Sequence, residues 1–205
     1  MPPKGKSDGA PAPLSLRERN RLRTRQELLD AALEVFAEDG YGSATVEAIA
    51  ARAGASKVTL YSYFPQGREE LFRELYEQIN NELIERVTEI YATDGHFGAR
   101  ILASTEALVN IAERPLIGRF YSIDDPALDS ALNPVRGHAS RVTADLIAKD
   151  LAAAQELRSL RTTAPPAAIA KLFVGAMTSA LSEVAKERAT SRDILHAMEA
   201  LVSAL

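Results

Sequence analysis

Apolar residues recur every three or four positions along most of this chain. The segments from residue 22 to 36 and from residue 71 to 87 both follow this spacing. Such a period places the apolar side chains on one face of a helix, whereas strands need strict alternation between turns, and no such stretch occurs. The pattern predicts an all-α protein with roughly nine helices.

Three helices are predicted in the N-terminal part. The first begins with a Ser-x-x-Glu capping box at Ser15, and it ends at Gly40, which can take a left-handed cap. A short second helix starts at Thr45, and Gly54 separates it from a third helix that starts at Ser56. Two short helices joined by a glycine-containing turn, with a stabilising helix in front, are typical of a helix-turn-helix.

Longer helices are predicted after Pro65. They cover about residues 68–90, 97–113, 116–123, 126–157 with a break at Asn133-Pro134, 165–189 and 191–205. The first residues are rich in Pro, Gly and Lys and have few apolar side chains to bury. We therefore divide the chain into a disordered tail (1–14), a helix-turn-helix domain (15–66) and a larger helical domain (67–205).

The third predicted helix carries side chains suited to a DNA groove. Leu60 and Phe64 are expected to face the core. The side chains left to face outward are Lys57, Val58, Thr59, Tyr61 and Tyr63. Lysine can bond a guanine edge or a phosphate, methyl groups can meet a thymine methyl, and tyrosine hydroxyls reach phosphate oxygens. The N-termini of the second and third helices, at Thr45 and Ser56, would offer free N–H groups to the DNA backbone.

The residues of the first three predicted helices resemble a known family. The stretch TVEAIAARAGASKVTLYSYF from residue 45, preceded by ALEVFAEDGY from residue 32, resembles the DNA-binding domain of TetR-family transcriptional regulators. The resemblance spans about residues 24–72. It implies a homodimer on a palindromic operator, usually a repressor that a small ligand in the C-terminal domain releases.

The resemblance also implies roles for single residues. By position, Thr45 and Tyr61 would contact phosphates, the side chains at 57–59 would face bases, and Tyr63 stands where the family often has His. The link to the fourth helix is one residue longer than the family's Phe-x-Ser-Lys-Glu-x-Leu. Arg68 is the candidate replacement for the family's phosphate-binding Lys, with Gly67 before it to adjust its reach. Taken alone, Lys57 and Arg68 are more often solvated surface charges. Within the motif, DNA contact is favoured for Lys57, whereas for Arg68 both interpretations stay open.

Charge is distributed unevenly along the chain. The net charge is −4, yet the first 25 residues carry seven Lys and Arg against two acidic residues. From residue 65 onward, fifteen basic residues face twenty acidic ones. A polyanionic partner is therefore expected at the N-terminal end. The alternating arginines from Arg17 to Arg25 cannot share one helix face, so they form either a solvated helix start or an arm that reaches an adjacent groove.

The last two predicted helices are amphipathic. Small residues one turn apart, Gly175 with Ser179 and Ala176 with Ala180, let another helix approach closely. The pair could cap the core of a single chain. The family resemblance implies instead that it forms a four-helix bundle with a partner subunit, and we adopt that interpretation.

A small-molecule effector site is sought among polar and aromatic residues embedded in apolar stretches. These candidates are Asn110, Arg119, Phe120, Tyr121, His138 and Arg141. Taken singly, each is more often a surface or core residue. The three histidines are scattered without paired-ligand spacing, so neither a metal nor another cofactor is expected.

Composition limits the alternatives. The chain has no cysteine, which excludes disulfides and thiolate chemistry and favours a reducing compartment. It has no run of about 18 apolar residues and no secretory h-region, so we expect a cytoplasmic protein without a membrane span. The rival to a DNA-binding regulator is a helical interaction or small-molecule-binding protein with a relic helix-turn-helix. An enzyme ranks third because the sequence has no catalytic constellation.

Overall fold

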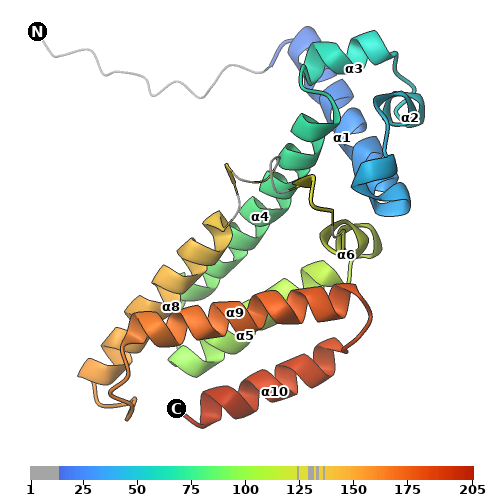
Figure 1. The fold of residues 1–205 in the computed structure, drawn as a ribbon. Coiled ribbons are helices and arrows are strands. Elements are labelled where there is room, and N and C mark those ends of the chain that lie inside the picture. The colour runs from blue at the N-terminus through green and yellow to red at the C-terminus, as the bar shows by residue number, and fades with distance from the viewer. Residues whose placement is uncertain (1–13, 124, 129–131, 133, 136) are drawn as a thin grey trace, which may run out of the picture.

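The computed structural model describes residues 14–205 apart from 124, 129–131, 133 and 136 (Figure 1). Within these residues every regular element is a helix, which confirms the all-α class. The helices are α1 (Leu16–Ser43), α2 (Val46–Arg52), α3 (Lys57–Tyr63), α4 (Arg68–Ala92), α5 (Phe97–Ala112), α6 (Pro115–Tyr121), α8 (His138–Glu156), α9 (Pro166–Ala185) and α10 (Ser191–Ser203). The predicted disordered tail, except Leu14, and Asn133 of the predicted break lie outside the described residues.

Local capping signals set the starts of the first three helices. The Ser15 hydroxyl accepts from the Glu18 N–H, and the Glu18 carboxylate accepts from the Ser15 N–H, which confirms the capping box. Thr45 caps α2 and Ser56 caps α3 through the same kind of bond. These bonds satisfy donors that a helix N-terminus leaves free.

The end of α1 differs from the prediction. Gly40 has φ 75° and ψ 170°, and one further turn follows it before the helix ends at Ser43. The regular helix is thus interrupted at Gly40, where the sequence predicts its end. The predicted left-handed cap is wrong, because that cap needs ψ near 45°. Leu22, placed on the apolar face by spacing, is also exposed, because the first turns of α1 extend beyond the core.

The helix α4 connects the two ends of the molecule. It runs from the small bundle of α1, α2 and α3 along the larger helical assembly (Figure 1). Its buried side chains follow one stripe: Leu71, Phe72, Leu75, Ile79, Leu83 and Val87. Near its start, the Phe72 ring stacks on Phe120 of α6 at 4.4 Å and meets Phe36 of α1 edge-on at 5.1 Å. This aromatic cluster joins α1, α4 and α6.

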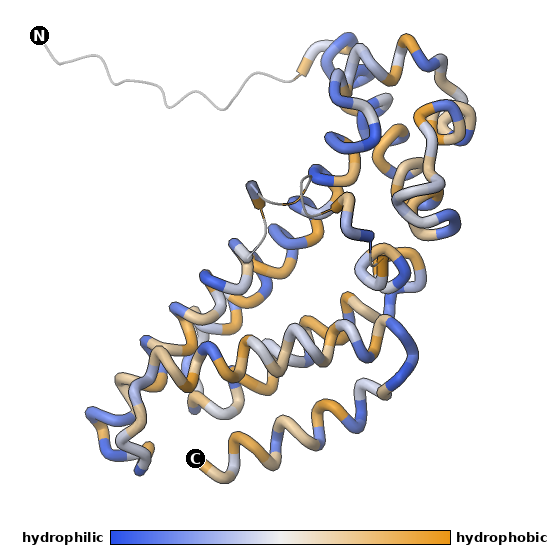
Figure 2. Tube along the Cα trace, viewed as in Figure 1, coloured by the Kyte–Doolittle hydropathy of each residue, from blue (hydrophilic) through white to orange (hydrophobic). Residues whose placement is uncertain are grey.

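The C-terminal helices form layers around α5. The helix α8 packs against α9, and both α9 and α10 pack against α5 (Figure 1). Figure 2 shows apolar residues along much of α9. By length and composition α9 could also cross a membrane, a test that core helices pass too, and only 33% of its apolar window is buried in this chain. The remaining apolar surface of α9 therefore needs another explanation.

Candidate nucleic-acid interface and effector cavity

The helix-turn-helix is built around a tight turn and a small buried core. Gly54 has φ +65°, and the Ala55 N–H donates to the Ala50 carbonyl at 2.9 Å across the turn. Only glycine adopts such a φ without strain. Leu60 and Phe64 are fully buried, as predicted, and fix the orientation of α3.

The opposite face of α3 is open to solvent. Val58 is 80% exposed and Tyr61 41% exposed, although both are large apolar or aromatic side chains. Lys57 is also exposed, whereas Thr59 and Tyr63 are half-buried. The predicted DNA-contacting residues of α3 thus lie on one short helix, with the N-caps Thr45 and Ser56 exposed beside them. Their contacts with DNA stay a prediction.

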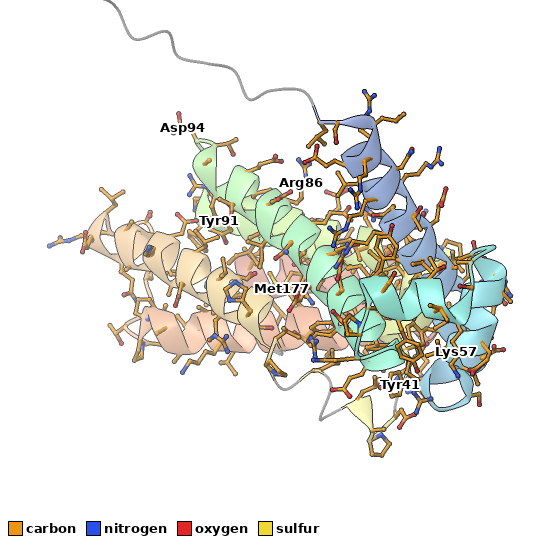
Figure 3. The ribbon with its side chains drawn as sticks, turned by 90° about the horizontal axis from the view of Figure 1, so that it is seen from above. Tyr41, Lys57, Arg86, Tyr91, Asp94 and Met177 are labelled. Atoms are coloured by element: carbon orange, nitrogen blue, oxygen red, sulfur yellow. The ribbon has the colours of Figure 1, made fainter. Side chains whose placement is uncertain are left out.

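Glu47 is a member of this face that the sequence alone did not single out. Its carboxylate forms an ion pair with the Lys57 ammonium, so α2 and α3 are joined across the turn (Figure 3 labels Lys57). The hydrogen bond between them lowers the pKa of Glu47 and raises that of Lys57. The Lys57 ammonium also lies 6.0 Å from the Tyr61 ring centroid. The signal in the sequence would have been an acidic residue in the first turn of α2, but its partner is ten residues away.

Arg68, the predicted phosphate contact, makes extensive contacts within the protein. Its Nη1 donates to the carbonyl oxygens of Tyr41 at 3.1 Å, Gly42 at 3.2 Å and Ala44 at 3.0 Å. Its guanidinium also lies 4.8 Å above the Tyr41 ring. These bonds tie the start of α4 to the turn between α1 and α2. Phosphate binding by Arg68 remains a prediction.

The N-terminal arginines divide into two groups. Arg25 forms a two-pronged ion pair with Glu74 of α4, and its guanidinium lies 4.8 Å from the Phe64 ring. This arginine therefore holds α1 against α4. The other four, Arg17, Arg19, Arg21 and Arg23, are exposed. Arg17 and Arg21 line an open groove together with Tyr63 at the end of α3. Their positions are compatible with both predictions, an arm that reaches DNA and a solvated start of the helix.

A cavity of about 230 Å³ lies between α4, α5, α6, α8 and α9. Most of its wall is apolar, with contributions from Leu83, Leu108 and Met177 (Figure 3 labels Met177). Its polar lining residues are Tyr76, Asn80, Ser104, Tyr121, Ser140, Thr143, Thr178 and Ser182. No charged side chain of the described residues lines it. The cavity can therefore enclose an uncharged, mostly apolar molecule.

The six predicted effector residues do not converge on this cavity. Tyr121 lines it, and burial raises the pKa of its phenol. Phe120 belongs to the aromatic cluster, and Arg119 donates to the Pro115 carbonyl at 3.2 Å beside a separate open groove.

The other three predicted effector residues lie away from the cavity wall. Asn110, His138 and Arg141 are exposed. The sequence reasoning missed the small polar residues Ser104 and Thr143. The only signal for them in the sequence was a hydroxyl residue on the apolar face of a predicted helix. Such a residue is usually a structural part of the core.

Each of α9 and α10 leaves a large apolar side chain uncovered. Leu172 is 76% exposed and Leu201 55% exposed in the single chain. Nothing lies within 4 Å of a Cβ built on Gly175, which sits on the same exposed side of α9. Among the described residues, no three His, Asp or Glu side chains gather as a metal site would require.

Comparison with known proteins relates this geometry to a family. A sequence model of the bacterial regulatory proteins of the tetR family matches residues 28–75, which include α2, α3 and the turn between them. The chain is 38% identical over 63 residues to the fatty acid metabolism regulator protein of Bacillus subtilis (strain 168), covering 31% of this chain and 32% of that protein. It is 30% identical over 142 residues to the HTH-type transcriptional activator FasR of Mycolicibacterium smegmatis, covering 65% of this chain and 64% of the relative. The chain thus spans less than two thirds of either relative.

A solved structure shares the fold over a longer stretch. The transcriptional regulator FadR from Bacillus subtilis, in complex with stearoyl-CoA, superposes with a TM-score of 0.68 at 17% identity. The match covers 84% of this chain and 96% of the other. At this identity the likeness establishes the fold alone.

Proposed function

Since this chain belongs to the tetR family of bacterial regulatory proteins, we propose that it is a transcriptional regulator that binds a palindromic DNA operator as a homodimer. The observation that carries the proposal is the exposed face of α3. Val58 and Tyr61 are too exposed to serve the core, and Lys57 beside them supplies the charge that DNA binding requires. We assign DNA binding to residues 15–66, and effector binding and dimerisation to residues 67–205.

The dimer is proposed to form through α9 and α10. The exposed Leu172 and Leu201 leave an apolar surface that a second copy would cover, and Gly175 leaves room for a close helix. In a two-fold dimer each copy presents the same patch, so one face suffices. Two copies would present two α3 helices to adjacent half-sites of an operator.

The effector is proposed to occupy the cavity between α4 and α9. The wall is mostly apolar. One relative is named for fatty acid metabolism, and a protein of the same fold was crystallised with stearoyl-CoA, so an acyl chain is the class we favour. At ~30 Å³ per water-sized group, 230 Å³ holds about eight such groups, and a stearoyl chain would require the cavity to widen. We propose that effector binding releases the protein from its operator, which makes it a repressor that acts in the cytoplasm. The related FasR is named an activator. Expression of a reporter gene placed under the operator, with and without the protein, shows whether this chain represses or activates transcription.

DNA binding is tested with the wild type and a double variant. Operator fragments are first selected from genomic DNA by binding to the full chain. Lys57→Ala combined with Tyr61→Phe should then abolish specific protection of the selected site in a footprint. Lys149→Ala, an exposed lysine on α8, should leave the footprint unchanged.

Two results would overturn the proposal. Unchanged protection by the double variant would show that α3 is not the reading helix. If the wild type shifted no DNA at low salt, the alternative function would be favoured, an interaction protein with a relic helix-turn-helix. A DNA-binding protein binds DNA of any sequence at low salt through its phosphate contacts.

A further inference from the structure

The start of α1 and the end of α3 border a common groove. Figure 1 shows the first turns of α1 beside α3. The residues that line the groove are Leu16, Arg17, Glu18, Asn20, Arg21, Thr24, Ser62 and Tyr63. Among the described residues of this lining, Leu16 is the only purely apolar one, so the groove suits a polar partner.

Helical spacing decides which arginines of α1 line this groove. Arg17 and Arg21 are one turn apart, so they share a face of the helix, and both line the groove. Arg19 and Arg23 are also one turn apart but are not part of the lining. Two residues correspond to roughly 200° around a helix, so this second pair lies on another face of α1. The alternating arginines thus form two separate pairs.

The groove continues the exposed face of α3. Ser62 lies one turn after Val58, and both side chains are exposed. A helix that lies in a major groove has a sugar-phosphate strand on each side. Side chains beside the reading helix therefore meet phosphates rather than base edges.

Arg25 holds α1 in place beside α3. It forms an ion pair with Glu74 of α4, and its guanidinium lies 4.8 Å from the ring of Phe64, the C-cap residue of α3. This contact comes one residue after Thr24, the last residue of α1 in the lining. The groove is therefore set before DNA binds, so its alignment adds little ordering cost.

The groove presents positive charge to a partner. Arg17 and Arg21 are both exposed. Glu18 also lines the groove, and its carboxylate accepts from the Ser15 N–H at 2.8 Å and from the Ser15 hydroxyl at 2.7 Å. That carboxylate lies at the N-terminus of α1, where the helix dipole offsets its charge. The two guanidinium groups remain for a partner, and guanidinium groups bind phosphates well.

We infer that Arg17 and Arg21 form a second DNA contact, which binds the phosphates that flank the base pairs read by α3. Arg19 and Arg23 stay solvated, so the arm and the solvated helix start describe different pairs of arginines. This inference rests on the proposed DNA binding and adds the flanking contact to it. Phosphate contacts carry no base sequence, so the pair should raise the affinity for every DNA.

The test compares two variants that lose the same number of charges from the same helix. Arg17→Gln with Arg21→Gln removes the groove pair, and Arg19→Gln with Arg23→Gln removes the other pair. Fluorescence anisotropy of the full chain with the selected operator, at several salt concentrations, gives the affinity and its salt slope.

The groove variant should bind the operator on the order of tenfold more weakly. Its salt slope should fall in magnitude by about 3–4, because a dimer loses four phosphate contacts at ~0.9 each. Its affinity for unrelated DNA should fall by the same factor. The other variant should stay within about twofold of the wild type, with a salt slope changed by less than about 1.

Hydroxyl-radical footprinting locates the contact on the operator. The groove variant should lose protection of the sugar-phosphate backbone at the flanks, and it should keep protection where α3 lies in each half-site. Circular dichroism of each variant checks that the helices are retained.

The outcomes separate this inference from the proposed function. Equal losses in the two variants overturn the inference, because the arginines would then act only through net charge. Wild-type affinity and wild-type flank protection in the groove variant also overturn it, while DNA binding through α3 stands. If the wild type binds no DNA in the anisotropy titration, the flanking contact and the proposed function both fail.

Discussion

At the scale of single residues, the charges of the proposed DNA face are constrained by partners in the protein. Lys57 is paired with Glu47, and Arg68 bonds three carbonyl oxygens at the turn between α1 and α2. An exposed ion pair contributes little to stability. The pair with Glu47 therefore affects mainly whether the Lys57 ammonium is available to contact DNA. Arg68 differs, because its bonds satisfy backbone acceptors where one helix ends and another begins.

Glu47→Gln should strengthen DNA binding. The substitution removes a negative charge from the proposed DNA face and frees Lys57 to approach a phosphate or base edge. We expect several-fold tighter binding at low salt and a steeper loss of affinity as salt rises. Fluorescence anisotropy at several salt concentrations measures both. Glu89→Gln, which breaks the exposed pair with Arg86 on α4, serves as the control and should change neither.

Arg68→Ala should destabilise the fold by about 1–3 kcal/mol, because three carbonyl oxygens lose a charged donor. Urea unfolding followed by circular dichroism gives this free energy. Arg86→Ala, which removes an exposed pair, should cost less than about 0.5 kcal/mol. If Arg68→Ala were as stable as the wild type yet bound DNA poorly, the side chain would serve phosphate contact rather than the turn.

At the scale of elements, Gly67 sets the angle between the helix-turn-helix and α4. It is the N-cap of α4 with φ 62° and ψ −132°, a conformation that other residues avoid. A Cβ there would lie 3.2 Å from Tyr61 and 3.3 Å from Val46, so the turn packs directly under α3. The longer link between α3 and α4 thus packs against α3, the proposed DNA-reading helix.

Gly67→Ala should therefore affect both stability and DNA binding. The strained backbone alone costs of order 1–3 kcal/mol, and the contact with Tyr61 must also relax. Gly54→Ala is the comparison, since Gly54 also has a positive φ but no atom lies within 4 Å of a Cβ built there. Chemical denaturation should rank Gly67→Ala as the less stable variant. The reverse order would contradict the packing of Tyr61 on this turn.

At the scale of the whole molecule, α4 and α6 connect the proposed DNA-binding face to the proposed effector cavity. Tyr121 faces the cavity, and its neighbour Phe120 stacks on Phe72 and lies 6.4 Å from Phe36 of α1. A change of cavity shape at α6 would therefore press on the helix that supports the DNA-binding unit. Operator binding is also proposed to need a partner copy. A partner bound at the exposed side chains of α9 and α10 would fix the spacing of the two DNA-binding units.

Leu172→Glu should convert the protein into a monomer. The substitution places a charge in the proposed interface but on the surface of the single chain, so the helical content should be unchanged. Light scattering coupled to size exclusion gives the mass, and operator affinity should fall by at least about tenfold, since two half-sites no longer bind together. Leu157→Glu, an equally exposed leucine at the end of α8, should remain dimeric. A dimer in both variants would place the interface elsewhere.

The sequence by itself determined the helical class, the caps at Ser15, Thr45 and Ser56, and the buried side of α3. These features follow from signals within a few residues: a capping hydroxyl, a glycine in a turn, and a period of 3.6. The close match to a known family rests on the same local stretch, residues 28–75.

Only the tertiary structure decided which distant residues meet. It paired Arg25 with Glu74 and placed Arg68 on the turn after α1. It also left Asn110, His138 and Arg141 on the surface, away from the cavity that they were predicted to line. A helical period states which face of a helix is buried but not which helix covers it. That choice depends on the packing of all the helices together.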